Sequence, residues 1–168
     1  ATKSAAHPIL VCVIIVAASV AAGFGIFSST GQGPRELETV RGTTVTVYGY
    51  GVYRHMSADV AIQGIGQDYV TLFLAVPALG VAFLLARRGG LRSRIVLAGV
   101  LAYFLVTYLF YLVMGTYNEL FLLYAILLGS SFFAFATVLL SIDTQRLTER
   151  FSSATFARDG GPQEPGES

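Results

Sequence analysis

Four long stretches of the chain contain no Asp, Glu, Lys, Arg or His. They hold 18 to 23 residues each, and at about 1.5 Å of rise per residue such helices match a hydrocarbon core of about 30 Å. Because lipid offers no hydrogen-bond partners, apolar runs of this length indicate helices, whose backbone bonds are internal. We predict an all-α integral membrane protein, a four-helix transmembrane bundle with helices at 8–27, 69–86, 95–115 and 120–142.

Charged residues are few, and all of them lie outside these four stretches. They make up 12% of the chain, against roughly 25% in soluble domains. Eleven Lys and Arg nearly balance ten Asp and Glu, so the chain lacks the basic surface of a nucleic-acid-binding protein. We therefore expect membrane lipids as partners and no nucleic acid.

The first stretch has two interpretations, because Lys3 followed by an apolar run also resembles a secretory signal peptide. The run is longer than the usual signal core of roughly 7–15 residues. The chain also still carries it, beginning at Ala1 as though only an initiator Met had been removed. We interpret the stretch as an uncleaved anchor.

Basic residues are unequally divided between the connections. Eight lie in 1–7, in 87–94 and after 142, whereas the opposite connections hold three. Since short cytoplasmic loops are enriched in Lys and Arg, both termini are expected to be cytoplasmic in a multi-pass plasma-membrane protein. This places an Arg-rich cytoplasmic loop at 87–94, a 41-residue extracytoplasmic loop at 28–68 and an outer turn at 116–119.

The extracytoplasmic loop begins with a Ser/Gly/Pro-containing linker at 28–34 and then changes character. Alternating Thr and Val from Thr43, followed by Gly49 and Gly51, predict a short β-hairpin over Thr43–Tyr53 that turns at Tyr48–Gly51. A two-stranded hairpin is marginally stable alone. We therefore expect it to pack on the outer mouth of the bundle.

The end of this loop and the second stretch form one predicted helix. Ser57 suits an N-cap, with Asp59 in the first turn. The helix is expected to run through Ala86, with Pro77 bending it.

The C-terminal region after the fourth stretch divides in two. Residues 143–158 place apolar residues on one helical side beside Arg146 and Arg150, which predicts an amphipathic interfacial segment on the inner leaflet. A frayed extension of the fourth helix is the alternative. Residues 159–168, rich in Gly and Pro, are expected to form a disordered tail.

Residues for redox or metal chemistry are scarce. The single cysteine, Cys12, lies mid-stretch and is expected to pack in the core, so dithiol exchange has no second thiol. His7 and His55 fall on opposite predicted sides and cannot share a haem or metal. We predict no metal, no cofactor and no catalytic residue; a bound lipid is compatible with this composition.

Polar and aromatic residues recur every four residues on the second and third stretches. If these faces point inward, they line an outward-opening cleft suited to a neutral or amphiphilic ligand, with two carboxylates at its mouth. The predicted ligand-binding residues are Gln63, Gln67, Asp68, Thr71, Tyr103, Thr107, Tyr111, Asn118, Glu119 and Tyr124.

These residues also have ordinary structural explanations. Tyr is common in the aromatic belt at membrane interfaces, and Thr or Gln inside a bundle often joins helices by hydrogen bonds. A hydrogen bond between helices is therefore the alternative to ligand binding for the Gln and Thr residues. Tyr103 is least easily explained by a belt, because it lies near the middle of its stretch.

Small residues form two ridges that allow close approach of helix backbones. Either ridge serves packing within the chain or contact with another membrane subunit or a second copy. The predicted packing residues are Ala17, Ala21 and Gly25 on the first stretch, and Ala78 and Ala82 on the second.

Several segments resemble a group of uncharacterised prokaryotic multispanning membrane proteins. The similar residues are Thr39–Gly42, Val47–Arg54, Gln67–Leu72 with Pro77, and Tyr117–Tyr124, so the resemblance extends over about 39–142. It implies a multispanning fold but carries no activity, substrate or catalytic residue. It also leaves open whether such a chain is a complete functional unit.

Three functions follow from these observations. The first is a non-catalytic membrane protein, either an accessory subunit of a membrane complex or a module that binds an amphiphile. The second is a transporter of a small solute or lipid that uses the outer cleft and the Pro77 bend. The third is a membrane enzyme acting on a lipid-like substrate, with Asp68 and Glu119 as acid and base.

Overall fold

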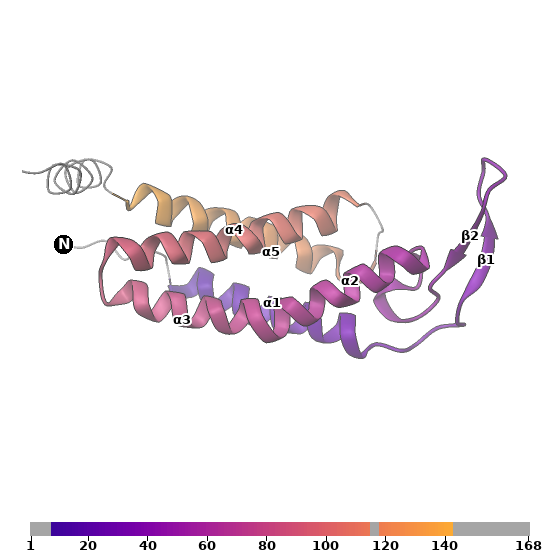
Figure 1. Ribbon diagram of the computed structural model, residues 1–168, viewed down its shortest axis with the longest axis horizontal. Helices are drawn as coiled ribbons and strands as arrows, with labels where there is room; N and C mark the ends of the chain where they lie inside the picture. Colours follow the sequence, from indigo (N-terminus) through magenta and orange to yellow (C-terminus); the bar gives the residue numbers. More distant parts are fainter. Residues whose placement is uncertain (1–7, 115–117, 143–168) are drawn as a thin grey trace, which may run out of the picture.

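The computed structural model is mostly helical and describes residues 8–114 and 118–142 (Figure 1). Four of its helices are long and apolar enough to cross a membrane: Pro8–Phe27, Ala58–Arg87, Leu91–Val113 and Phe121–Leu140. They correspond to the four predicted stretches, with the second beginning well before Tyr69. The chain is therefore consistent with a multi-pass membrane protein.

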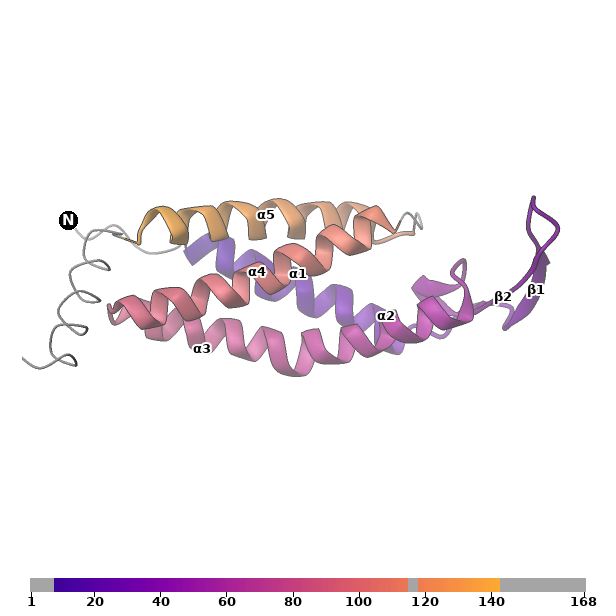
Figure 2. The same cartoon turned by 45° about the horizontal axis from the view of Figure 1, so that its top comes forward.

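The four helices run side by side along the long axis of the molecule and alternate in direction (Figures 1 and 2). Helix α1 (Pro8–Phe27) packs on α5 (Phe121–Leu140), and α4 (Leu91–Val113) packs on both α5 and α3 (Val76–Arg87). Helix α2 (Ala58–Val70) continues into α3 and lies against α1. The start of α1, the α3–α4 connection and the end of α5 share one end of the molecule.

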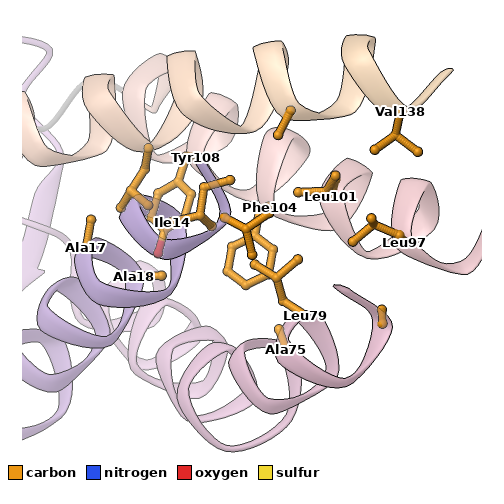
Figure 3. Packing of buried hydrophobic residues seen from close by; sticks show 14 of the residues in the cluster. Ile14, Ala17, Ala18, Ala75, Leu79, Leu97, Leu101, Phe104, Tyr108 and Val138 are labelled. Atoms are coloured by element: carbon orange, nitrogen blue, oxygen red, sulfur yellow. The ribbon is translucent and has the colours of Figure 1, made fainter. Parts of the chain in front are cut away.

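The core between these helices is apolar and closely packed (Figure 3). Ile14, Leu79, Leu101 and Phe104 are fully buried, and small residues of α1 such as Ala18 allow the helices to approach. The outward faces are apolar as well, with large exposed side chains on each of the four helices. Helices that are apolar on all sides are typical of membrane spans.

The two predicted small-residue ridges occupy different environments. Ala17, Ala21 and Gly25 are all buried on α1. On α3, Ala82 is buried but Ala78 is only half-buried, and the buried row there continues through Leu79. Cys12 is exposed, so its expected place in the core was wrong: its neighbour Val11 faces the core, and one residue further turns the side chain outward.

A π-helical turn, η2 (Thr71–Ala75), joins α2 to α3. Pro77 lies just after it, where the ring has no N–H and would clash with the carbonyl of Phe73 in a regular α-helix. The wider turn accommodates this, and the N–H of Val76 reaches the carbonyl of Thr71. Figure 2 shows the helix bending at this point, as the sequence predicts.

The β-hairpin lies earlier in the chain than predicted. Strand β1 (Arg35–Glu38) pairs antiparallel with β2 (Thr44–Val47), and the turn falls at 39–43 with Gly42 at φ +75°. The placement at Tyr48–Gly51 was wrong because β1 is exposed along its whole length and has one apolar residue, Leu37, so it lacks the alternating pattern that identifies a strand.

Gly49 and Gly51 lie outside the hairpin turn, in the connection at 28–57 that we call the outer loop. Both have positive φ and fold the chain back on 28–33, where the Gly51 N–H donates to the Thr30 carbonyl. A short 3₁₀ turn, η1 (Gly51–Tyr53), follows. The hairpin itself projects away from the helices (Figure 1) and does not pack on their outer mouth as expected; only Val47 at its base is buried.

Several predicted segments lie outside the described residues. These are 1–7, the amphipathic segment at 143–158 and the tail at 159–168.

We predict that Phe104→Ala lowers the free energy of unfolding by about 3–5 kcal/mol, because the ring is fully buried and its loss leaves a cavity. Phe133→Ala is the matched control, since that ring is 62% exposed on the outer face of α5. Denaturant titration in micelles, followed by circular dichroism, measures both. Equal losses in the two variants would contradict the packing described.

Candidate functional site

A buried carboxyl group joins three elements at the end of the helices opposite to the α3–α4 connection. Asp68 of α2 is 6% exposed. The hydroxyl of Tyr53, from η1, donates to Asp68 Oδ2 at 2.5 Å, and the hydroxyl of Tyr111, from α4, donates to Asp68 Oδ1 at 2.9 Å. The outer loop is therefore hydrogen-bonded to the helices through this carboxyl group.

Two glycines make room for this cluster. A Cβ atom on Gly25 of α1 would overlap Asp68 Oδ2, and one on Gly64 would lie 2.8 Å from the ring of Tyr53. The carbonyl of Gly64 also accepts a hydrogen bond from Tyr111 at 3.2 Å. Gly25, predicted as a general packing residue, thus has a specific reason to be glycine.

The Tyr53 phenol is a firmly neutral donor. Its side chain is almost fully buried, and this burial, together with the nearby Tyr111 and Asp68, raises the pKa of Tyr53 far above its usual value. Tyr53 therefore keeps its proton throughout the physiological range.

A second polar cluster lies one turn deeper, between α2 and α4. Gln67 Nε2 donates to the Tyr103 hydroxyl at 2.7 Å and lies 3.4 Å from Thr107 Oγ1. Thr71 Oγ1 is 2.9 Å from the same Tyr103 hydroxyl. These bonds connect the two helices, which is the interhelical role considered for Gln67 and Thr71, and they also place an amide beside the cavity described next.

A cavity of about 640 Å³ runs between α2 and α4, and we call it the α2–α4 groove. Its exposed apolar lip includes Val106, Phe110 and Met114, so it opens to the side of the helices. The lining is Tyr53, Met56, Val60, Gln63, Gly64, Gln67, Gly99, Ala102, Tyr103, Val106, Thr107, Phe110, Tyr111 and Met114. Among the residues that the structure describes, the lining contains no Asp, Glu, Lys, Arg or His.

The structure brings half of the predicted ligand-binding residues together. Gln63, Gln67, Tyr103, Thr107 and Tyr111 all line the α2–α4 groove. Of these, Gln63 is exposed and makes no hydrogen bond within the described part of the chain, and the second polar end of the Gln67 amide is likewise without a partner there.

The other five lie elsewhere. Asp68 and Thr71 are buried behind the lining. Asn118 accepts a hydrogen bond from the Leu120 N–H just before α5, and Tyr124 stacks with Tyr108.

Glu119, the fifth, forms an ion pair with Arg54 and, within the described residues, shares no partner with Asp68. The bond to its own backbone N–H and then Arg54 lower the pKa of Glu119. Because both side chains are exposed, the pair contributes little to stability.

Sequence reasoning missed several lining residues. Tyr53 and Met56 come from the outer loop, where no helical periodicity identifies a face. Phe110 lies three residues after Thr107, so a wider helical face on the third stretch would have included it.

A second cavity of about 830 Å³ lies on the other side of the molecule, between α1 and the outer loop. Phe24 and Phe27 of α1 line it, with Arg54 and Glu119 also in the lining. The polar clusters around Asp68 and Gln67 do not reach it.

Comparisons with protein-family models, curated proteins and solved structures found no match to this chain. Within the described residues, no three His, Cys, Asp or Glu side chains are grouped as a metal site requires. The fold and site define a multi-helix chain with a lateral groove and a buried carboxyl group beside it.

We predict that Gly25→Ala lowers the free energy of unfolding by about 1–3 kcal/mol, since the added methyl group displaces Asp68 from its two phenol partners. Gly23→Ala is the matched control, two residues away on the same helix, because a Cβ atom there meets nothing within 4 Å. Thermal unfolding in micelles compares the two. If both variants unfold like the parent protein, the close approach of α1 to Asp68 is wrong.

Proposed function

We propose that the four helices form a transmembrane bundle in the plasma membrane, with both termini cytoplasmic. The exposed apolar faces support insertion in lipid. The four arginines of 87–94 lie at the α3–α4 end, whereas the opposite end carries three arginines spread over the long loop. The bias of basic residues toward the α3–α4 end supports this orientation.

Cysteine labelling tests the orientation. In a Cys12→Ser background, Thr43→Cys should react with a membrane-impermeant maleimide in intact cells, because the residue lies in the exposed turn of the hairpin. Ser93→Cys, near the α3–α4 connection, should react only after permeabilisation. The reverse labelling pattern would overturn the proposed topology.

The function we propose is a non-catalytic module that binds an amphiphile in the α2–α4 groove. The observation that carries this is the groove itself, with an apolar lip among the lipid-facing side chains and two glutamines in its wall. A volume of about 640 Å³ lies within the usual range for small-molecule sites, roughly 300–1,000 Å³. Lipid-like molecules would enter from the side without crossing water.

The chemistry of the lining favours a neutral headgroup. Among the described residues no charged side chain lines the groove, and the Gln63 amide and the Gln67 amide oxygen have no hydrogen-bond partner there. A hydroxyl, ester or amide headgroup can use these groups, while an acyl or isoprenoid chain lies along Val106, Phe110 and Met114. A phosphate or carboxylate headgroup would find no cation in the lining.

The other functions considered are supported to different degrees. The π-turn η2 lies directly below Gln67 and favours a transporter as the second candidate, since such turns are frequent at functional sites. The acid–base pair is less favoured, because Asp68 bonds to phenols while Glu119 pairs with Arg54. A role as an accessory subunit requires a partner on the outer faces, and co-purification from mild detergent would identify one.

We predict saturable labelling of α4 by a monoacylglycerol with a photoactivatable chain, in vesicles containing the full chain. Unlabelled monoacylglycerol should compete. Exchange of Gln63 and Gln67 for Leu should weaken competition by about tenfold, which corresponds to about 1.4 kcal/mol and to the loss of one or two hydrogen bonds.

Gln32→Leu is the matched control, since Gln32 lies in the outer linker and bonds only to Arg35 within the described residues. Mass spectrometry locates the labelled peptides. Labelling that does not saturate, or that is the same in the groove variant and the control, would overturn the proposed ligand site.

A further inference from the structure

The cluster around Asp68 contains more close oxygen contacts than its hydroxyl groups can fill. Tyr111 has one hydroxyl proton but two acceptors, Asp68 Oδ1 at 2.9 Å and the Gly64 carbonyl at 3.2 Å. The hydroxyl of Tyr53 is committed to Asp68 Oδ2. With an ionised carboxylate, Tyr53 and Tyr111 donate to its two oxygens, and the contact of Tyr111 with the Gly64 carbonyl is secondary.

One additional proton fits the same geometry and uses the Gly64 contact as well. If Asp68 carries a proton on Oδ1, it donates to the Tyr111 oxygen, and Tyr111 donates to the Gly64 carbonyl. Tyr53 still donates to Oδ2. Each of the three hydroxyl groups then has its own acceptor, as groups buried away from water require.

Within the described residues, no cation bonds to Asp68 and stabilises its ionised form. Asp68 bonds only to the two phenols there, and Arg54, the basic residue beside Tyr53 in sequence, pairs with Glu119. An ionised carboxylate buried without a cationic partner is costly, and an ionisable group at membrane depth is by default a candidate functional site.

We propose that Asp68 is a proton-binding site linked to the α2–α4 groove, which rests on the proposed function. The link is structural, because Tyr53 and Tyr111 bond to Asp68 and also line the groove. With Asp68 protonated, Tyr111 of α4 is bonded to Gly64 of α2 across the outer end of the groove. Loss of the proton returns the Tyr111 hydroxyl to Asp68 and leaves only one of the two bonds between Tyr111 and α2.

Because α1 packs closely against Asp68, a change in the protonation of Asp68 acts on the elements at the opposite side of the carboxyl group. Gly25 leaves no space for Asp68 to move toward α1. The change therefore falls on Tyr111 and Tyr53, and through Tyr53 on η1. Ligand and proton should accordingly both favour the arrangement in which Tyr111 is bonded to Asp68 and to Gly64.

The remaining titratable groups near the cluster do not duplicate this behaviour. Tyr108 of α4 and Tyr124 of α5 are buried phenols, and the part of α1 against Asp68 is Gly25. His55, Arg54 and Glu119 form a separate group at the exposed edge of the outer loop. Glu119 is the other carboxylate there and supplies a control.

The test is equilibrium binding of the monoacylglycerol probe to the full chain in vesicles between about pH 5 and pH 9. Affinity of the parent protein should be constant at low pH and then fall by up to about tenfold per pH unit, as one linked proton requires. Asp68→Asn should bind with the low-pH affinity at every pH, because its amide N–H replaces the carboxyl proton. Glu119→Gln should keep the parent profile.

A parent profile that is independent of pH, or an identical fall in Asp68→Asn, would overturn the proton site and leave the amphiphile site intact. Absence of saturable binding at every pH would instead overturn the proposed function. If Asp68→Asn does not fold, isotope-edited infrared spectra of the parent protein decide the question. A protonated-carboxyl C=O band from Asp68 at neutral pH supports the proposal, and a carboxylate band from Asp68 overturns it.

Discussion

The outer half of the molecule depends on how a single carboxyl group is accommodated away from water. Asp68 receives hydroxyl groups from η1 and α4, and α1 approaches it at a residue without a side chain. The loop packs on α2 through a buried apolar cluster of Val52, Tyr53, Met56 and Ala61, and the hydrogen bond of Tyr53 adds a specific tie between the loop and α2. Leaving a buried polar group unpaired costs more free energy than making the pair gains, so the position of Tyr53 relative to Asp68 is strongly constrained.

The two halves of the helices are stabilised in different ways. Toward the α3–α4 connection the core is apolar, with Leu79, Leu97 and Leu101 fully buried. Toward the outer loop, polar groups pair across helices at Gln67 and again at Asp68. The π-turn η2 lies between the two halves. The apolar half therefore holds the helices together by packing, and the half beside the loop contains the groove and its polar hydrogen bonds.

The sequence predicted the helices well because their physical cause is local: a charge-free run of the right length has few alternatives in lipid. It also predicted Gln67, Tyr103 and Thr107 on facing surfaces, since helical spacing is a local property. The hairpin was misplaced because its first strand has a single apolar residue and therefore no alternating pattern. Tyr53 was missed because its role depends on a loop returning to α2, which no spacing encodes.

Asp68 shows most clearly why local patterns mislead about environment. The apolar run begins at Tyr69, so the sequence places the carboxylate at the membrane boundary, where a charge is unremarkable. The helix begins at Ala58, close to the start predicted from Ser57, but three other elements surround the position, so Asp68 is nearly as buried as the apolar core. Its environment is set by Tyr53, Tyr111 and Gly25, which come from separate parts of the chain. Burial of a charge-bearing group by distant residues is a tertiary property, and it is also what gives this position a chemistry that the apolar spans lack.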